Sequence, residues 1–175
     1  MKPGPVAADW SNYAFVALGS NLGASDDLFS KVLLKLQELA DGVLLRSAWW
    51  KSSPVDCPPD SPEFLNGMVA FKPRSSLTAE SLLARLQTLE REFGRVQKKT
   101  LNEPRPLDLD LISFNNQIRN DAHLTLPHPR AHLRHFVLQP LAEIAPDFVL
   151  PGFTESADVI LRGLRTDERL MKLGD

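Results

Sequence analysis

One stretch of the sequence decides the fold: Leu107-Asp108-Leu109-Asp110-Leu111-Ile112-Ser113-Phe114. Its first five residues alternate leucine and aspartate, and a period of two predicts a β-strand with one buried face and one wet face. Residues two apart on a strand project from the same face, so the two carboxylates have Cα atoms on the order of 7 Å apart. We therefore expect residues 107–114 to form a strand that presents an acidic pair on one face of a sheet.

Five segments upstream of this strand complete a regular order of elements. Periodicity, turn residues and helix caps predict a strand, a helix, two strands and a helix at residues 13–18, 26–41, 43–52, 64–71 and 78–94. The β-α-β-β-α-β order is that of the ferredoxin-like plan, in which an antiparallel sheet carries both helices on one face. Helical spacing at 129–145 and 154–164 predicts cover for part of the other face. We predict an α+β fold with three layers, αβα, and a C-terminal extension of helices and strand.

The chain has 175 residues, enough for one domain with a sizeable core. Residues 1–12 contain Pro3, Gly4 and Pro5 and show no apolar period, so we expect a flexible leader that adds nothing to the core. A single domain is then expected over residues 13–175. Residues 53–63 hold four prolines, too many missing N–H donors for a helix or a central strand, and are expected to form a loop.

Composition argues against several classes of protein. Lys plus Arg total 20 against 22 Asp plus Glu, a net charge of -2, so no general field would hold the chain on nucleic acid or anionic lipid. The single cysteine, Cys57, cannot form an internal disulfide, and no N-terminal stretch has the pattern of a signal peptide. No apolar run approaches the roughly 20 residues needed to cross a bilayer. These features favour a protein of the cytoplasm.

Basic residues border the acidic pair. Arg95, Lys98 and Lys99 precede it, and Arg105 lies between two prolines directly before the strand. Magnesium is typically held by one or two carboxylates plus substrate phosphates, and two-metal sites place their ions about 4 Å apart, a spacing that the pair can bracket. Phosphoryl chemistry needs cations beside such a site. Two other interpretations stay open: a solvated strand face for the aspartates, and favourable charge past a helix C-terminus for the basic residues.

Three histidines offer a second candidate site. His128, His132 and His135 have spacings of four and three, which is compatible with a three-histidine zinc site. No acidic residue lies among them, and flanking prolines predict that His128 belongs to a turn before the helix. We prefer His128 and Arg134 as phosphate contacts, because both donate hydrogen bonds to anions. The sequence has neither a P-loop nor a Gly-x-Gly-x-x-Gly motif.

Aromatic residues are expected in the core by default. Trp49 and Trp50 are adjacent on a predicted strand and therefore point to opposite faces, with core packing favoured for at least one. Phe64 and Phe136 are likewise assigned to the core on residue type alone. Cys57 has no base beside it in the sequence and is given no role.

Four blocks of the sequence together resemble one family. They read Phe-Val-Ala-Leu-Gly-Ser-Asn-Leu-Gly at 15–23, Phe-Leu-Asn at 64–66, Pro-Arg-Pro-Leu-Asp-Leu-Asp-Leu at 104–111, and Leu-Thr-Leu-Pro-His-Pro-Arg at 124–130. The family is the 6-hydroxymethyl-7,8-dihydropterin pyrophosphokinases of folate synthesis, and the resemblance runs from about residue 13 to residue 151. It implies a ferredoxin-like enzyme that transfers the pyrophosphoryl group of MgATP to the pterin hydroxymethyl oxygen and releases AMP.

The resemblance also implies roles for the matching residues. The catalytic set would be Arg95, Arg105, Asp108 and Asp110, with the two aspartates coordinating two magnesium ions. The nucleotide side would comprise Glu90, Lys98, Leu124, Thr125, His128 and Arg134. The pterin side would comprise Gly19, Ser52, Pro54, Val55, Phe64, Asn66 and Phe136. There the two phenylalanines would sandwich the pterin ring, which reverses the core assignment above, and the asparagine amide would read the pterin edge.

The sequence departs from the family pattern just before Pro104. Leu101-Asn102-Glu103 stands where many members have Arg-Trp-Gly, and Gln97 replaces a frequent arginine. We expect an active enzyme with weaker loop-mediated rate enhancement, in which Asp108 is the best candidate for accepting the hydroxyl proton. Two alternatives are a catalytically weakened relative that binds pterin or nucleotide, and a ferredoxin-like module that binds RNA through its sheet. The resemblance favours a monomer with small-molecule substrates and neither nucleic acid nor membrane as partner.

Overall fold

A six-stranded sheet forms the centre of the molecule in the computed structural model, which describes residues 8–21, 26–53, 60, 62–94 and 106–174. Its strands are β1 (Ala14–Ser20), β2 (Leu45–Arg46), β3 (Trp50–Ser52), β4 (Phe64–Phe71), β5 (Asp108–Phe114) and β8 (Leu170–Lys172). They lie in the order β5-β1-β4-β3-β8, all neighbours antiparallel, and β2 also pairs with β4. With β2 and β3 counted as one interrupted strand, this is the predicted ferredoxin-like order, extended at one edge by β8.

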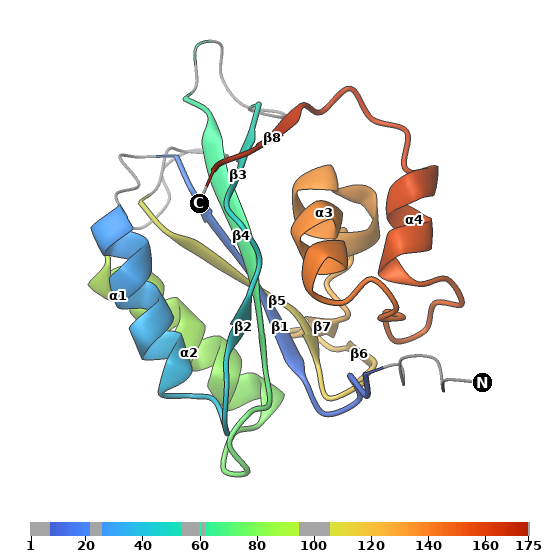
Figure 1. Cartoon of the computed structure of the whole chain (residues 1–175). Helices are drawn as coiled ribbons and strands as arrows, with labels where there is room; N and C mark the ends of the chain where they lie inside the picture. The colour runs from blue at the N-terminus through green and yellow to red at the C-terminus, as the bar shows by residue number, and fades with distance from the viewer. Residues whose placement is uncertain (1–7, 22–25, 54–59, 61, 95–105, 175) are drawn as a thin grey trace, which may run out of the picture.

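Helices cover both faces of this sheet (Figure 1). α1 (Asp26–Gln37) and α2 (Ala79–Glu92) pack on one face, and α3 (His135–Ile144) and α4 (Ala157–Gly163) lie on the other. A 3-10 turn, η1 (Ala131–Leu133), precedes α3, and a small hairpin of β6 (Arg119–Asn120) and β7 (Thr125–Leu126) stands beside β5. The prediction of a three-layer α+β fold with a C-terminal extension is confirmed. In the described part of the chain no helix is long and apolar enough to cross a membrane.

Strand alternation divides the apolar side chains into two cores. In β1, Val16 and Leu18 join the core under α1 and α2, whereas Phe15 joins the core under α3 and α4. The same division holds in β5, where Leu111 faces the first core and Ile112 the second. Each buried branched or aromatic side chain of this size contributes about 2 kcal/mol to folding. Because both faces are apolar over most of the sheet, a polar residue on either face calls for an explanation.

Helix α2 begins and ends where its sequence predicts. The Thr78 hydroxyl accepts the backbone N–H of Ser81, and the Ser81 hydroxyl accepts the N–H of Thr78, so the two form a capping box. Past the other end, Gly94 has a φ of +95°, which a residue with a side chain rarely adopts. The buried stripe of the helix is Leu82, Leu86 and Leu89.

The strand expected over residues 43–52 is interrupted, and the prediction of one long strand is wrong. Arg46 pairs with Val69 and Trp50 with Asn66, so three residues on one side oppose two on β4. Such an extra residue makes a β-bulge. Ser47 stabilises it, because its N–H donates to the Met68 carbonyl and its hydroxyl accepts the Met68 N–H.

The two adjacent tryptophans point to opposite faces, as predicted. Trp49 packs on the first core with its ring 4.1 Å from that of Phe29. Trp50 turns to the other face, where its Nε1–H donates to Glu143 of α3 at 3.0 Å. The pair thus ties the sheet to a helix on each side.

The expected leader is not separate from the core where it is described. Residues 1–7 lie outside the described residues. Trp10 is half-buried on the second core, with its ring 5.0 Å from Tyr13 and 5.7 Å from Phe15. Its Nε1–H donates to Asp147 at 2.9 Å. The expectation that this segment adds nothing to the core is wrong for Trp10. A single aromatic ring can pack on the core even where the surrounding residues show no regular spacing of apolar side chains.

Candidate active site

The acidic pair stands on the face of the sheet that carries α3 and α4. Asp108 and Asp110 are half-buried, whereas Leu109 between them is buried in the core under α1 and α2. The alternation predicted for this strand is therefore confirmed. It directs both carboxylates to the face opposite that core, at the start of β5.

A position without a side chain lies next to Asp108. In register, Gly19 of β1 faces Asp108 of β5 on one side and Asn66 of β4 on the other. A Cβ atom at Gly19 would lie 3.7 Å from Asn66 Oδ1 and 3.8 Å from Asp108 Cβ. Gly19 thus leaves a gap between a carboxylate and an amide, into which a ligand atom can enter.

Asn66 is held by the neighbouring strand. Its Nδ2 donates to Ser52 Oγ at 2.8 Å, and both residues are buried. Ser52 is paired in register with Phe64, two residues from Asn66 on the same face of β4. The structure therefore brings together four residues of the predicted pterin side, Gly19, Ser52, Phe64 and Asn66, on three adjacent strands.

Phe136 lies in the first turn of α3 and is half-buried on the second core. Arg134 directly precedes the helix, and its guanidinium carbon lies 5.3 Å from the centre of the Phe136 ring. A guanidinium at this distance from an aromatic ring is attracted to its π-system. A residue predicted for the nucleotide side and one predicted for the pterin side are thus in contact.

His128 lies in the turn between β7 and η1, as predicted. Its backbone N–H donates to the Ile112 carbonyl. Its ring Nδ1 accepts the backbone N–H of Arg130 at 3.2 Å, so the proton of the neutral ring is on Nε2. Burial, then the charges of Arg134 and Arg130, lower the pKa of His128 to about 4, against the opposing effect of Asp108. The ring is therefore a neutral donor near neutral pH, and its electrostatic neighbours are Asp108 and the two arginines.

Glu90 has a structural role that the sequence analysis missed. It is buried on α2, and its Oε1 accepts the backbone N–H of Leu109 at 2.7 Å. β5 is the edge strand of the sheet, so this bond satisfies one of its N–H groups and joins α2 to the acidic strand. A carboxylate on the buried face of a helix is the signal that could have revealed such a bond.

The β6–β7 hairpin carries Leu124 and Thr125, the former buried and the latter half-buried. Arg119 anchors this hairpin, with ion pairs of 2.6 Å to Glu80 of α2 and 2.7 Å to Asp121. Asp121 also accepts the N–H of Leu124. The hairpin leads through β7 directly to His128, so its anchoring also limits where that ring lies.

The histidines do not form a metal site. His132 contacts the ring of Phe153, and Nδ1 of His135 lies 3.4 Å from the Glu168 carbonyl. Among the residues that the structure describes, no group of three or more His, Cys, Asp or Glu side chains is arranged to hold a metal ion. The three-histidine zinc interpretation is therefore wrong.

Several predicted residues lie outside the described residues. These are Arg95, Lys98, Arg105, Pro54 and Val55, together with the unusual 101–103 segment. Their predicted roles stay predictions.

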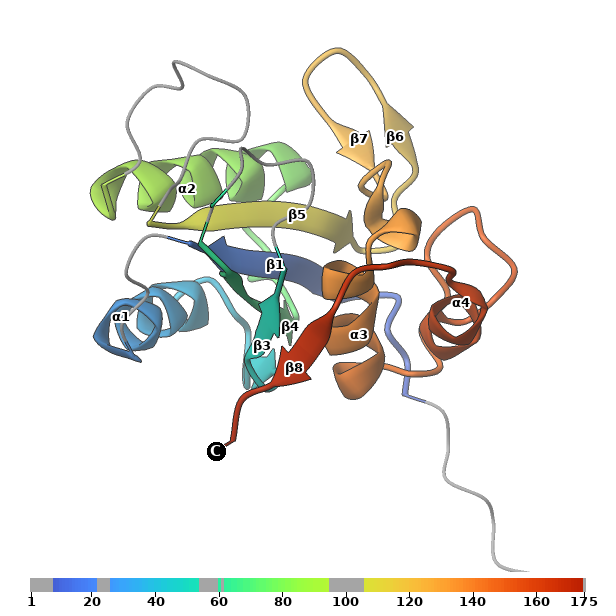
Figure 2. The same cartoon turned by 90° about the horizontal axis from the view of Figure 1, so that it is seen from above.

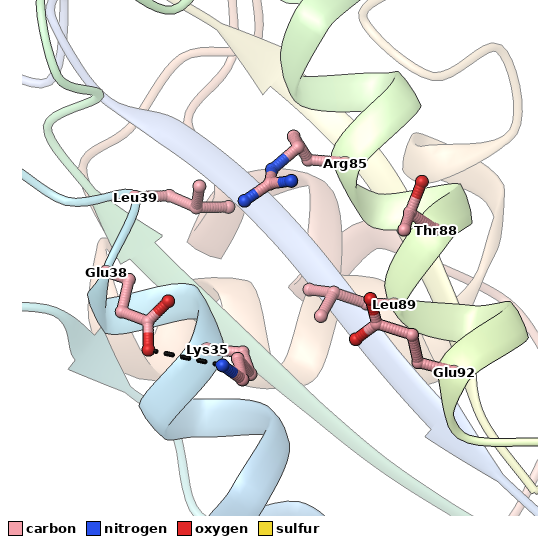
Figure 3. Close-up of a pocket in the computed structure, with 7 residues that line it drawn as sticks. All are labelled: Lys35, Glu38, Leu39, Arg85, Thr88, Leu89 and Glu92. Atoms are coloured by element: carbon pink, nitrogen blue, oxygen red, sulfur yellow. Dashed lines mark hydrogen bonds and ion pairs between the residues drawn. The ribbon is translucent and has the colours of Figure 1, made fainter.

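A hollow of about 70 Å³ lies between α1 and α2, away from the acidic pair (Figure 3). Its wall comprises Lys35, Glu38, Leu39, Arg85, Thr88, Leu89 and Glu92. Lys35 pairs with Glu38 inside it. Since the sheet separates this helical layer from Asp108 and Asp110, the hollow takes no part in the site.

Comparisons with known proteins agree on one family. Residues 15–146 match the model of the 7,8-dihydro-6-hydroxymethylpterin-pyrophosphokinase (HPPK) family. The chain is 35% identical over 161 residues to the 2-amino-4-hydroxy-6-hydroxymethyldihydropteridine pyrophosphokinase of Haemophilus influenzae, covering 91% of this chain and 97% of that protein. It is 41% identical over 138 residues to the Synechocystis protein of the same name, covering 79% of this chain and 69% of the relative.

Solved structures resemble the fold. A Plasmodium falciparum HPPK-DHPS chain matches with a TM-score of 0.67 at 13% identity, over 87% of this chain. This chain spans 43% of that longer one. At such low identity the likeness concerns the fold alone.

Proposed function

The chain belongs to the 7,8-dihydro-6-hydroxymethylpterin-pyrophosphokinase family, and from this premise we propose that the sheet face around Asp108 and Asp110 is its active site. The activity of the family is ATP-dependent transfer of a pyrophosphoryl group to 6-hydroxymethyl-7,8-dihydropterin in folate biosynthesis, and this chain is a diphosphotransferase of that kind. The observation that best supports this location of the active site is the gap at Gly19, between Asp108 and the Asn66 amide.

The pterin binds on the β1, β3 and β4 side of this gap. Asn66 presents an amide that both donates and accepts, and its bond to Ser52 fixes its orientation. Phe64 and Phe136 stack on the two faces of the flat heterocycle. Pro54 and Val55 complete this side with backbone groups. The absence of a side chain at Gly19 lets the hydroxymethyl group reach the acidic pair.

The nucleotide binds on the β5 side. His128, as a neutral Nε2–H donor, and Arg134 contact the phosphates, while Leu124 and Thr125 of the anchored hairpin contact the nucleoside. Glu90 supports β5 from behind. Arg95, Lys98 and Arg105 add positive charge at the transferred group, as phosphoryl transfer requires.

Asp108 and Asp110 fit a site for two magnesium ions. Two half-exposed carboxylates on one strand face supply hard oxygen ligands, and substrate phosphates supply others in sites of this type. When bound, magnesium neutralises charge on the phosphate oxygens and orients them. The chain uses ATP as co-substrate, and the number of ions is part of our proposal.

The reaction is an in-line displacement at the β-phosphorus of ATP. The hydroxymethyl oxygen forms a bond to this phosphorus, the bond from it to the oxygen shared with the α-phosphate breaks, and AMP leaves with the bond's electron pair. Asp108 borders the Gly19 gap, and we propose that its carboxylate accepts the hydroxyl proton. Positioning and electrostatic stabilisation supply most of the acceleration.

We further propose a monomeric cytoplasmic enzyme with one domain over residues 13–175 and no nucleic acid partner. The covering of the sheet by α3 and α4 argues against RNA binding through that face, and the acidic pair would repel phosphates in the absence of a metal. A gel shift with short RNA at micromolar protein tests this point, and a salt-sensitive shift would contradict it.

The first experiment mixes the protein with ATP, magnesium and 6-hydroxymethyl-7,8-dihydropterin and measures AMP. We expect Asp110→Asn to fold normally and to lower turnover by at least about a hundredfold, because a ligand of the metal and its charge are lost. Asp41→Asn, at an exposed position after α1, is the matched control and should retain full activity. Near-normal turnover by Asp110→Asn would refute the metal assignment. Binding of pterin without AMP formation by the unaltered protein would favour the weakened relative.

A further inference from the structure

The last part of the chain returns to the candidate site. Residues 165–174, here called the C-terminal strap, run from α4 past α3 to the edge of the sheet, where β8 pairs with β3 (Figures 1 and 2). The strap lies beyond residues 15–146, which match the family model. Its contacts join two elements that carry predicted pterin residues, α3 and β3.

The strap holds the beginning of α3 through Glu168. This helix has no capping bond from its own N-cap side chain, at Arg134. Instead Glu168 Oε2 accepts the backbone N–H of His135 at 3.0 Å. The backbone N–H of Phe136 also acts on this carboxylate and lowers its pKa. A carboxylate at a helix N-terminus satisfies free N–H groups and is favoured by the helix dipole. Glu168 therefore caps α3 from a distant part of the chain.

The Glu168 cap carries a cost in folding free energy, which opposes its stabilising effect on α3. Glu168 Oε1 is buried and has no hydrogen-bond partner among the described residues. Burial is the largest influence on the group and raises the pKa of Glu168, although the bonds to His135 and Phe136 oppose the change. A buried, unbonded carboxylate oxygen costs free energy, so the arrangement calls for a functional explanation.

The strap holds β3 at its other end. Leu170 pairs with Ser52, and Ser53 donates its N–H to the Arg169 carbonyl at 3.2 Å. Lys172 binds Glu143 in the last turn of α3 at 3.0 Å, and the same carboxylate accepts the Trp50 indole N–H. The strap thus fixes the distance between α3 and β3 from both ends of the helix.

We propose that Glu168 is a positioning residue for the pterin site, which sets the first turn of α3, and with it Phe136, at a fixed place relative to Ser52 and Asn66. This inference rests on the proposed function, because it needs Phe136 to stack on the pterin. Glu168 does not touch the substrate; it acts through the backbone of α3.

The experiment compares Glu168→Ala and Glu168→Gln with Glu155→Gln, a control at an exposed position before α4. Steady-state kinetics give KM for pterin and ATP and kcat, and calorimetry gives the pterin Kd. We expect Glu168→Ala to raise the pterin KM and Kd by about tenfold, the equivalent of a lost helix cap, with kcat and the ATP KM changed by at most about twofold. Glu168→Gln, whose amide oxygen can still accept the His135 N–H, should restore most of the affinity.

A parallel variant separates this inference from the site assignment. Phe136→Ala should weaken pterin binding more than Glu168→Ala does. If Phe136→Ala binds pterin normally, the proposed pterin site is wrong. If Phe136→Ala weakens binding while Glu168→Ala behaves like Glu155→Gln, or weakens ATP as much as pterin, the role of Glu168 is refuted and the site stands. Should Glu168→Ala fail to fold, Glu168→Asp, which keeps the charge but has a shorter side chain, replaces it. The same comparison then decides the question: the change in the pterin KM and Kd against the change in kcat and the ATP KM.

Discussion

His128 shows how a single residue takes its chemistry from its surroundings. The ring lies in a turn where Arg130 and Arg134 contribute positive charge and Asp108 the opposing negative charge. Burial and the two guanidiniums dominate, so the pKa falls to about 4 from an ordinary value of 6.5. A neutral ring with its proton on Nε2 can donate to a phosphate without adding a charge that the arginines would repel.

A pH dependence of stability follows from this pKa. Between pH 6.5 and 4 the unfolded chain binds a proton at His128 that the folded protein does not, so the free energy of unfolding should fall as the pH falls through this window. Urea denaturation without ATP or metal measures it. We expect His128→Gln to lose less stability than the unaltered protein between these pH values, and the exposed control His123→Gln to match the unaltered protein. If the free energy of unfolding depended on pH in the same way in both variants, the lowered pKa of His128 would be contradicted.

At the scale of elements, β1 and β4 each contain one glycine, and a glycine is needed at the two positions for different reasons. Gly67 of β4 lies under Trp49, whose ring atoms would be 2.5 Å from an added Cβ, so a close approach of ring and backbone requires glycine there. Gly19 of β1 has only ordinary contact distances around its missing Cβ, so packing does not require a glycine there. We infer that glycine is needed at this position because it leaves a methyl-sized gap beside Asp108. One glycine serves packing and the other serves the site.

A matched pair of alanine variants tests this distinction. Gly67→Ala should lower the free energy of unfolding by about 2 kcal/mol or more, because the Trp49 ring must move within a packed core. Gly19→Ala should fold with a stability within about 1 kcal/mol of the unaltered protein and lower kcat/KM for pterin by about tenfold or more, because the methyl group fills the gap. Chemical denaturation and AMP formation measure the two effects. A fully active Gly19→Ala would remove the main support for the site.

The sequence predicted the elements well where local rules decide them. Strand β4 and helix α2 have the expected limits, since an apolar run, the Thr78 cap and Gly94 are local signals. The interruption of the 43–52 strand could not be predicted, because the bulge depends on Ser47 bonding to Met68 across the sheet. Such a partner is visible only when the strands are already paired.

The candidate site was also predictable only in part, because some of its contacts leave no local signal in the sequence. Alternation alone placed Asp108 and Asp110 on one face, and the family resemblance supplied the partners Asn66 and Phe136. Neither signal indicated Glu168, which lies outside the resembling blocks and reaches α3 only in the folded chain. Interactions between segments distant in sequence, made by residues of ordinary type, leave no local pattern.

At the scale of the whole molecule, the two end segments of the chain stabilise the layer of α3 and α4. The strap joins α3 to β3, and Trp10 packs beside the start of β1 and binds Asp147 in the turn after α3. The two attachments lie toward different ends of the sheet, because Trp10 packs beside Phe15 whereas the site begins at Gly19. These four positions along β1 correspond to about 13 Å. Stability and activity can therefore be separated at Trp10.

Trp10→Ala should destabilise the fold without altering catalysis. Loss of the half-buried ring from Tyr13 and Phe15 should lower the free energy of unfolding by about 2 kcal/mol, less than for a fully buried tryptophan. Trp10→Phe keeps a ring but loses the bond to Asp147, and should cost about 1 kcal/mol. Both should have kcat and KM within about twofold of the unaltered protein below their unfolding temperatures, since the site lies several residues away along β1. Denaturation midpoints unchanged in both variants would show that residues 1–12 are the independent leader that composition alone suggests.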